Sequence, residues 1–131
     1  MKDFGELMKS ADWKTEKHAP VIECADEVAA DQAITVTASV GKEIAHPNTT
    51  AHFIAWIELY FLPEGGQFPY QIGRAEFSAH GASAQGADSS GVYTNPSVTV
   101  SFKTETSGTI YATSYCNVHG LWKNAREITV K

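Results

Sequence analysis

The stretch Ser114-Tyr115-Cys116-Asn117-Val118-His119-Gly120-Leu121-Trp122 follows the end of a predicted strand and turns at a glycine. The Cys116 thiol and the His119 imidazole are separated by two residues, so both can turn toward one metal ion. Gly120 lets the backbone double back tightly beside them. Two ligands do not hold a transition metal alone, so the stretch gains meaning only from ligands elsewhere in the chain.

Three other histidines lie in segments with a loop-like composition. One segment is Glu16-Lys17-His18-Ala19-Pro20, and the other is His46-Pro47-Asn48-Thr49-Thr50-Ala51-His52. Pro47 restricts the backbone of the residue before it, which helps to aim the ring of that histidine. Four imidazoles and one thiolate are enough for a mononuclear site of a redox metal. The candidate ligands are His18, His46, His52, His119 and Cys116.

Length and composition predict one globular domain spanning residues 1–131, of which 43% are apolar. The formal net charge is -5, and no basic stripe is visible, so we expect no nucleic-acid partner. We find no run of about 18 apolar residues and expect no membrane partner. The first residues lack the apolar segment and cleavage site of a signal peptide, so we expect a cytoplasmic protein.

Most of the chain has the alternating, β-branched pattern of strands. The pattern predicts strands at residues 33–40, 51–62, 70–80, 97–102, 109–115 and 127–130, and a short helical turn at residues 4–8. Pro20 favours an extended conformation at Ala19, and from there on the pattern is that of strands. About seven strands with frequent turns indicate an all-β sandwich. We expect strands 97–102 and 109–115 to pair across the turn Thr106-Ser107-Gly108.

The strand at residues 51–62 is apolar on both faces. The alternation places Phe53, Ile57, Leu59 and Phe61 on one face and His52, Ile54, Trp56 and Tyr60 on the other. A strand of this kind is typically covered twice, by the core and by a second layer such as another subunit. The glycine-rich residues 81–91 are interpreted as a mobile loop without chemistry.

Two further residues receive structural interpretations. Cys24 and Cys116 could form one disulfide, but a reducing compartment and a metal role for Cys116 favour free thiols, with Cys24 small and buried. His80, at the end of a strand, is interpreted as a surface or hydrogen-bonded polar group.

The ligand set narrows the choice of metal. Structural zinc sites have four ligands and usually more than one thiolate. Five ligands suit a square pyramid with one open position, which fits iron. Blue copper is the alternative, because it also uses a sandwich, histidines and a strand-end cysteine. The methionines are Met1 and Met8, neither of which closely follows His119, although a glutamine or carbonyl axial ligand stays open.

Three motifs in this order resemble superoxide reductases of the neelaredoxin type, from about residue 12 to the end of the chain. They are Glu16-Lys17-His18-Ala19-Pro20, His46-Pro47 with His52 six residues on, and Cys116-Asn117-Val118-His119-Gly120-Leu121-Trp122. Two-iron relatives carry an additional N-terminal domain with a four-cysteine iron site. This sequence has no such cysteines, so it resembles the one-iron class.

The resemblance implies an immunoglobulin-like sandwich that holds one non-haem iron. Its ligands would be four equatorial histidines (His18, His46, His52 and His119), the axial thiolate of Cys116 and, in the oxidised form, Glu16 at the sixth position. Lys17 would lie near the open face. The implied reaction is the one-electron reduction of superoxide to hydrogen peroxide, with rubredoxin as the electron donor and a homotetramer as the assembly.

The chemistry of this site suggests smaller roles for neighbouring residues. Lys17 would attract an anion that a net charge of -5 otherwise repels. The backbone N–H groups of Val118 and His119 are placed to donate to the Cys116 sulfur. Tyr115 and Trp122 are interpreted as core packing. Two alternatives stay open: a cupredoxin-like copper electron carrier, and a metal-free immunoglobulin-like binding module.

Overall fold

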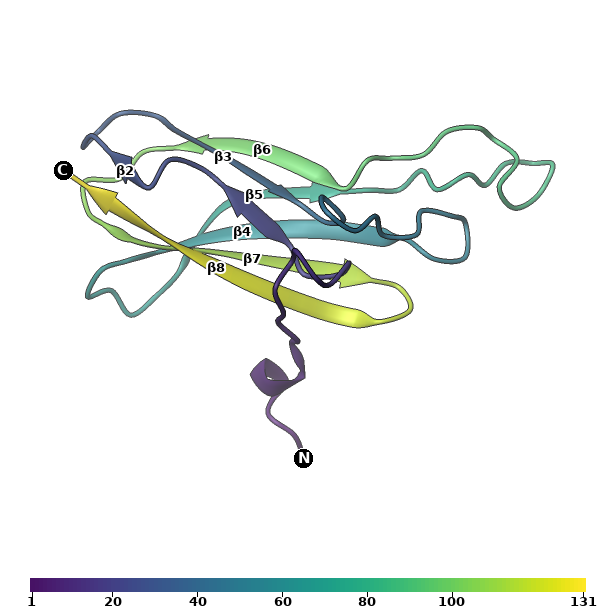
Figure 1. Ribbon diagram of the computed structural model, residues 1–131, viewed down its shortest axis with the longest axis horizontal. Coiled ribbons are helices and arrows are strands. Elements are labelled where there is room, and N and C mark those ends of the chain that lie inside the picture. Colours follow the sequence, from purple (N-terminus) through teal and green to yellow (C-terminus); the bar gives the residue numbers. More distant parts are fainter.

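The computed structural model describes residues 1–131, which form eight strands and one short 3-10 helix, Phe4–Leu7. Two sheets pack face to face, and the N-terminal residues extend away from them (Figure 1). The smaller sheet has the order β1-β3-β6 and the larger has the order β2-β8-β7-β4-β5. The strands are β1 Val21–Glu23, β2 Glu27–Val28, β3 Ile34–Ser39, β4 Ile54–Pro63, β5 Tyr70–Glu76, β6 Ser97–Phe102, β7 Gly108–Cys116 and β8 Gly120–Val130. The predicted all-β sandwich is confirmed.

The core lies between the sheets and is built from alternate residues of each strand. Along β3, Ile34, Val36 and Ala38 are buried, while the residues between them are half-buried or exposed. Ile110 and Ala112 of β7 face the same core from the larger sheet. The alternation visible in the sequence is therefore the in-and-out alternation of the sandwich.

A β-bulge corrects the predicted faces of β4. The register of β4 against β7 shifts between Ile54 and Trp56. The extra residue reverses the alternation at this point, so Ile54 is buried in the core together with Ile57. The predicted placement of Ile54 on the opposite face from Ile57 is wrong, and Phe53 lies before the strand begins.

The expected hairpin between residues 97–102 and 109–115 is also wrong. β6 pairs with β3, while β7 pairs with β4 and β8. The connection between β6 and β7 therefore crosses from one sheet to the other, as sandwich connections do. β8 begins at Gly120 rather than at residue 127, because pairing with β7 along its whole length outweighs the weak strand propensity of Lys123 and Asn124.

This topology brings the candidate ligands to one end of the sandwich. Cys116 ends β7 and pairs with Gly120 at the start of β8, and it also faces Ile54 at the start of β4. Gly120 has a φ of 80°, the left-handed conformation that the tight turn requires. His18 precedes β1, and the segment with His46 and His52 connects β3 to β4. The structure contains no helix that is long and apolar enough to cross a membrane.

Candidate metal centre

Five predicted ligands meet at this end of the sandwich. The ligand atoms of four of them, His18, His52, His119 and Cys116, lie within 4.8 Å of one another. The fifth, His46, has its ring centroid 4.9 Å from that of His18 and 4.8 Å from that of His52. The structure therefore gathers residues that are up to 101 positions apart in the chain.

The turn after β7 places a sulfur beside an imidazole. Cys116 is fully buried, and its Sγ accepts a hydrogen bond from the backbone N–H of His119 at 3.3 Å. The His119 Nδ1 lies 3.9 Å from that sulfur and 3.0 Å from the Nε2 of His18. Of the two N–H groups expected at the sulfur, the structure shows the His119 donor.

Two of the rings are oriented by hydrogen bonds at their outer nitrogens. The Nδ1 of His46 donates to the Pro47 carbonyl at 2.6 Å. The Nδ1 of His18 lies 2.5 Å from a carboxylate oxygen of Glu16. A donating Nδ1 leaves the lone pair of a neutral imidazole on Nε2, which is how outer partners prepare a histidine to bind a metal.

The inner nitrogens provide the test of whether the site fits a metal. The Nε2 atoms of His46 and His52 are buried and have no hydrogen-bond partner. A buried polar atom without a partner is costly and rare, so two in one cluster call for an explanation. A cation among these nitrogens and the Cys116 sulfur satisfies both atoms.

The same burial keeps these imidazoles neutral. The pKa of His46 is lowered to about 4, mainly by burial and in smaller part by the nearby His18, His52 and Lys17, against the opposing effect of the Pro47 carbonyl. The pKa of His52 is also lowered, mainly by burial. Neutral imidazole is the form that binds metal, so these residues need not lose a proton near pH 7.

Glu16 faces the outer side of His18. Besides the contact with the ring Nδ1, its carboxylate accepts hydrogen bonds from the backbone N–H groups of His18 at 2.6 Å and Ala19 at 2.9 Å. Burial raises the pKa of Glu16, but these hydrogen bonds outweigh it and hold the pKa below its usual value. In this conformation Glu16 orients His18, and its role as a sixth ligand stays a prediction.

Lys17 lies close enough to His46 and His52 for its charge to act on both. Its side chain is half-buried, and its charge contributes to the lowered pKa of both histidines. The predicted place of Lys17 near an open face of the site stays a prediction.

Two supporting residues were missed in the sequence, although both lie in its central motif. The Asn117 side chain accepts from the Phe53 N–H at 2.8 Å and donates to the Ala51 carbonyl at 2.9 Å, which ties the turn after β7 to the segment with His52. Trp122 packs in the core, as expected, but its ring also stacks on His18 at 4.9 Å with an interplanar angle of 12°. Strand position alone does not reveal either contact.

The remaining histidine and cysteine lie outside the cluster. His80 is buried and hydrogen-bonded rather than exposed. Cys24 is a free, half-buried thiol whose pKa is raised by burial. The free-thiol interpretation is confirmed for both cysteines, although Cys24 is less buried than expected.

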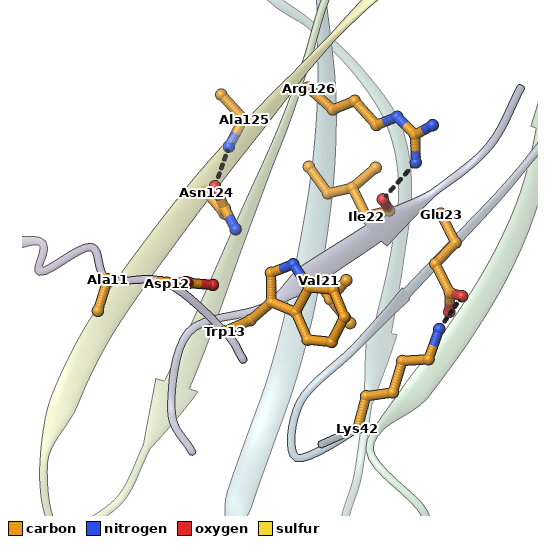
Figure 2. A pocket seen from close by; sticks show the side chains of 10 residues that line it. All are labelled: Ala11, Asp12, Trp13, Val21, Ile22, Glu23, Lys42, Asn124, Ala125 and Arg126. Atoms are coloured by element: carbon orange, nitrogen blue, oxygen red, sulfur yellow. Dashed lines mark hydrogen bonds and ion pairs between the residues drawn. The ribbon is translucent and has the colours of Figure 1, made fainter. Parts of the chain in front are cut away.

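A pocket of about 460 Å³ lies elsewhere, between the segment around Trp13 and β1 and β8. Figure 2 shows the Glu23–Lys42 ion pair and the hydrogen bond from Arg126 to the Ile22 carbonyl within it. The Lys42 ammonium also lies 5.6 Å from the centre of the Trp13 ring. None of the five candidate ligands lines this pocket, and its basic groups Lys42 and Arg126 already have partners.

A β-sandwich with a histidine and cysteine cluster at one end defines a mononuclear metalloprotein. The desulfoferrodoxin family model matches residues 10–125, so the chain belongs to the desulfoferrodoxin family. The sequence is 53% identical to neelaredoxin from Megalodesulfovibrio gigas over 96% of this chain and 97% of the relative. It is 54% identical to superoxide reductase from Pyrococcus furiosus over 98% of this chain and 99% of the relative.

Solved structures agree with this assignment. The crystal structure of a relative from Thermotoga maritima superposes with a TM-score of 0.97 at 48% identity and covers 100% of this chain and 99% of its own. The reduced superoxide reductase (neelaredoxin) from Archaeoglobus fulgidus has a TM-score of 0.87 at 57% identity and covers 94% and 98%. The predicted resemblance is confirmed, and neither the cupredoxin nor the metal-free alternative fits this family.

Substitution of Trp122 tests how its ring and its unpaired indole N–H each affect stability. The Nε1–H of Trp122 is buried without a hydrogen-bond partner, so Trp122→Phe keeps an aromatic ring against His18 and removes an unsatisfied group. We expect Trp122→Ala to lower the free energy of unfolding of the metal-free protein by about 3–5 kcal/mol, and Trp122→Phe to cost clearly less. Urea denaturation of both variants measures this difference. Equal losses would mean that the indole N–H has a stabilising partner.

Proposed function

We propose that residues 1–131 form a single domain that holds one iron ion on His18, His46, His52, His119 and Cys116 and reduces superoxide to hydrogen peroxide there. The desulfoferrodoxin and neelaredoxin family uses a mononuclear iron centre. The relative from Pyrococcus furiosus is a superoxide reductase. The observation that carries the proposal is the pair of buried, unpartnered Nε2 atoms on His46 and His52 beside the thiol of Cys116.

The reaction adds one electron and two protons to superoxide and yields hydrogen peroxide. The four histidines and Cys116 would hold an iron ion, and the ferrous and ferric states of such an ion would supply the single electron. The protein residues provide the ligands, attract the anion and control its surroundings. An external donor must return the electron, and we propose a rubredoxin-like protein for this role.

Neutral ligands make the site attractive to an anion. His46 and His52 are held neutral by burial, so four imidazoles and one thiolate would cancel only one positive charge of the metal. Lys17 adds a positive charge on the same side, which opposes the net charge of -5 of the whole chain. Superoxide is therefore drawn to the face near Lys17.

The sulfur is tuned by its single backbone donor. The His119 N–H to Cys116 Sγ hydrogen bond withdraws electron density from the sulfur and stabilises the thiolate. Burial of Cys116 excludes water from this side of the site. His119 itself is exposed, so the opposite boundary of the site is open to solvent and to its protons.

Glu16 has two roles in this proposal. It orients His18 in this conformation, and its carboxylate would be available as a further ligand in the oxidised protein. Binding the metal would require the carboxylate to exchange its hydrogen bonds with His18 and Ala19. The conformation of the Glu16 side chain would thus differ between the reduced and the oxidised protein.

The first experiment tests the metal and its thiolate. We expect about one iron per chain by elemental analysis, a visible charge-transfer band after oxidation, and consumption of superoxide without oxygen release. Cys116→Ser should abolish the band and the activity, because an alcohol is a poor substitute for the thiolate. Cys24→Ser is the matched control, since it removes the other free thiol and should leave iron, band and activity unchanged. A band that survives in Cys116→Ser would disprove the assignment of Cys116 as the thiolate ligand.

Lys17→Ala tests electrostatic attraction. We expect the second-order rate constant with superoxide to fall by roughly tenfold, with iron content unchanged, because steering by charge raises on-rates by at least this factor. The rate of the wild type should also fall with added salt. Lys103→Ala is the control. Lys103 is exposed and directly follows β6, which ends at the other end of the sandwich from the end of β7 (Figure 1). Equal rates in Lys17→Ala and Lys103→Ala would remove the steering role.

We also propose a cytoplasmic homotetramer. Exposed aromatic side chains on and beside β5 and β7 support a further covering layer, among them Phe68, Tyr70 and Tyr111. Light scattering coupled to gel filtration should give four times the 14.2 kDa of one chain. Tyr70→Glu is expected to shift the mass toward smaller species, and a monomeric wild type would contradict the assembly.

A further inference from the structure

We propose that His80, which is not a metal ligand, is a positioning residue that holds the segment of His46 and His52 in its metal-binding conformation. This inference rests on the proposed function, in which those two residues bind the metal. The observations that carry it are the contacts of His80 with three residues of that segment: Asn48, Thr50 and Phe53.

His80 is fixed on several sides. His80 is 7% exposed, and its ring stacks on Phe53 with a centroid distance of 3.8 Å and an interplanar angle of 13°. The Nδ1 lies 3.2 Å from the Oδ1 of Asn48, and the Nε2 faces the Phe77 carbonyl. A neutral imidazole donates to one of these oxygen atoms at a time, and an imidazolium donates to both.

The contact with Asn48 leads directly to a metal ligand. The Asn48 Nδ2 donates to the Thr94 carbonyl at 2.9 Å, so the amide oxygen must face His80. Asn48 follows Pro47, whose carbonyl accepts from the Nδ1 of His46 at 2.6 Å. His80 therefore fixes Asn48, the backbone next to it and, through the Pro47 carbonyl, the ring orientation that turns the Nε2 of His46 toward the cluster.

A second connection grips the middle of the segment. The Thr50 hydroxyl donates to the His80 carbonyl at 2.8 Å. The Thr50 N–H donates to a carboxylate oxygen of Asp88 at 2.9 Å, and the Asp88 N–H donates back to the Thr50 hydroxyl at 3.0 Å. The segment between His46 and His52 is thus held by His80, just before the glycine-rich loop, and by Asp88 within that loop.

The loop of residues 81–91 is built to make these contacts. Gly81 has a φ of 87°, and a Cβ there would lie 2.6 Å from the Tyr93 ring, so the position requires glycine. The Gly81 carbonyl accepts hydrogen bonds from the N–H groups of Ser89 and Ser90 at 2.7 and 2.9 Å. The sequence-based interpretation of a loop without a chemical role is therefore replaced by one in which the loop supports the metal site.

Two variants and one control test the inference in the complete protein. His80→Phe keeps an aromatic ring against Phe53 but removes both ring nitrogens, and Asn48→Ala removes the acceptor with less disturbance of packing. The control is Ile128→Ala, which opens the buried core at the other end of the sandwich. The register pairs Gly108 with Ile128 and Cys116 with Gly120, so this control lies eight residues, or about 26 Å, along the strand from Cys116.

The measurements are the rate of ferrous iron release to a chelator, the ferric charge-transfer band and the thermal midpoint. We expect His80→Phe and Asn48→Ala to release iron about tenfold faster and to shift the band, as loss of an outer partner of a ligand does. Ile128→Ala should lower the thermal midpoint but release iron at the wild-type rate. Unchanged release in both variants, or equally fast release in the control, would overturn the inference.

Hydrogen exchange in the metal-free protein separates this inference from the proposed function. We expect faster exchange at the amides of residues 46–53 in His80→Phe and Asn48→Ala than in the wild type or Ile128→Ala. If the wild type holds no iron but this difference appears, the proposed function is wrong and the positioning role of His80 for the segment stands. If iron binds and the difference is absent, only the inference about His80 is wrong.

Discussion

Two buried imidazole nitrogens without hydrogen-bond partners are the constraint around which this end of the protein is built. The Nε2 atoms of His46 and His52 have lost water without gaining a donor, and such burial is costly. The sandwich tolerates it because the outer atoms of the cluster are satisfied, as in the hydrogen bond from His46 Nδ1 to the Pro47 carbonyl. Metal binding returns a partner to each inner nitrogen, so the binding free energy also stabilises the folded protein.

The strands supply the precision and the connections supply the ligands. β4 and β7 are neighbours in the larger sheet, so Cys116 at the end of β7 lies beside the start of β4. Asn117 then joins the turn after β7 to the segment before β4 by two hydrogen bonds. A ligand segment without regular structure thereby becomes as well placed as a strand, because its backbone groups are paired with a rigid neighbour.

The sequence was sufficient for properties that depend on local pattern and residue type. Alternation predicted β3, β4, β6 and β7, and the spacing of cysteine and histidine predicted which residues the structure brings together. Non-local pairing was not accessible: β6 joins β3 rather than β7, and a bulge after Ile54 reverses the faces of β4. For the same reason, no pattern along the chain indicates that Asn48 and His80 are in contact, because the two residues are 32 positions apart in the sequence.

Electrostatics connects the burial of the ligands to the reaction. A carboxylate-rich site would bind a cation strongly but would also cancel its charge, and a chain with a net charge of -5 would then repel superoxide. Histidine ligands with buried ring nitrogens would avoid this problem, because the burial that lowers the pKa of His46 to about 4 also leaves its imidazole without a charge. Of the proposed ligands, only the Cys116 sulfur would bind the metal as an anion, and it lies on the buried side of the site while His119 is exposed. On the proposed ligand set, the positive charge of the metal and of Lys17 would be presented toward solvent, where an anion must arrive. The choice of imidazole over carboxylate would then itself be part of substrate recognition.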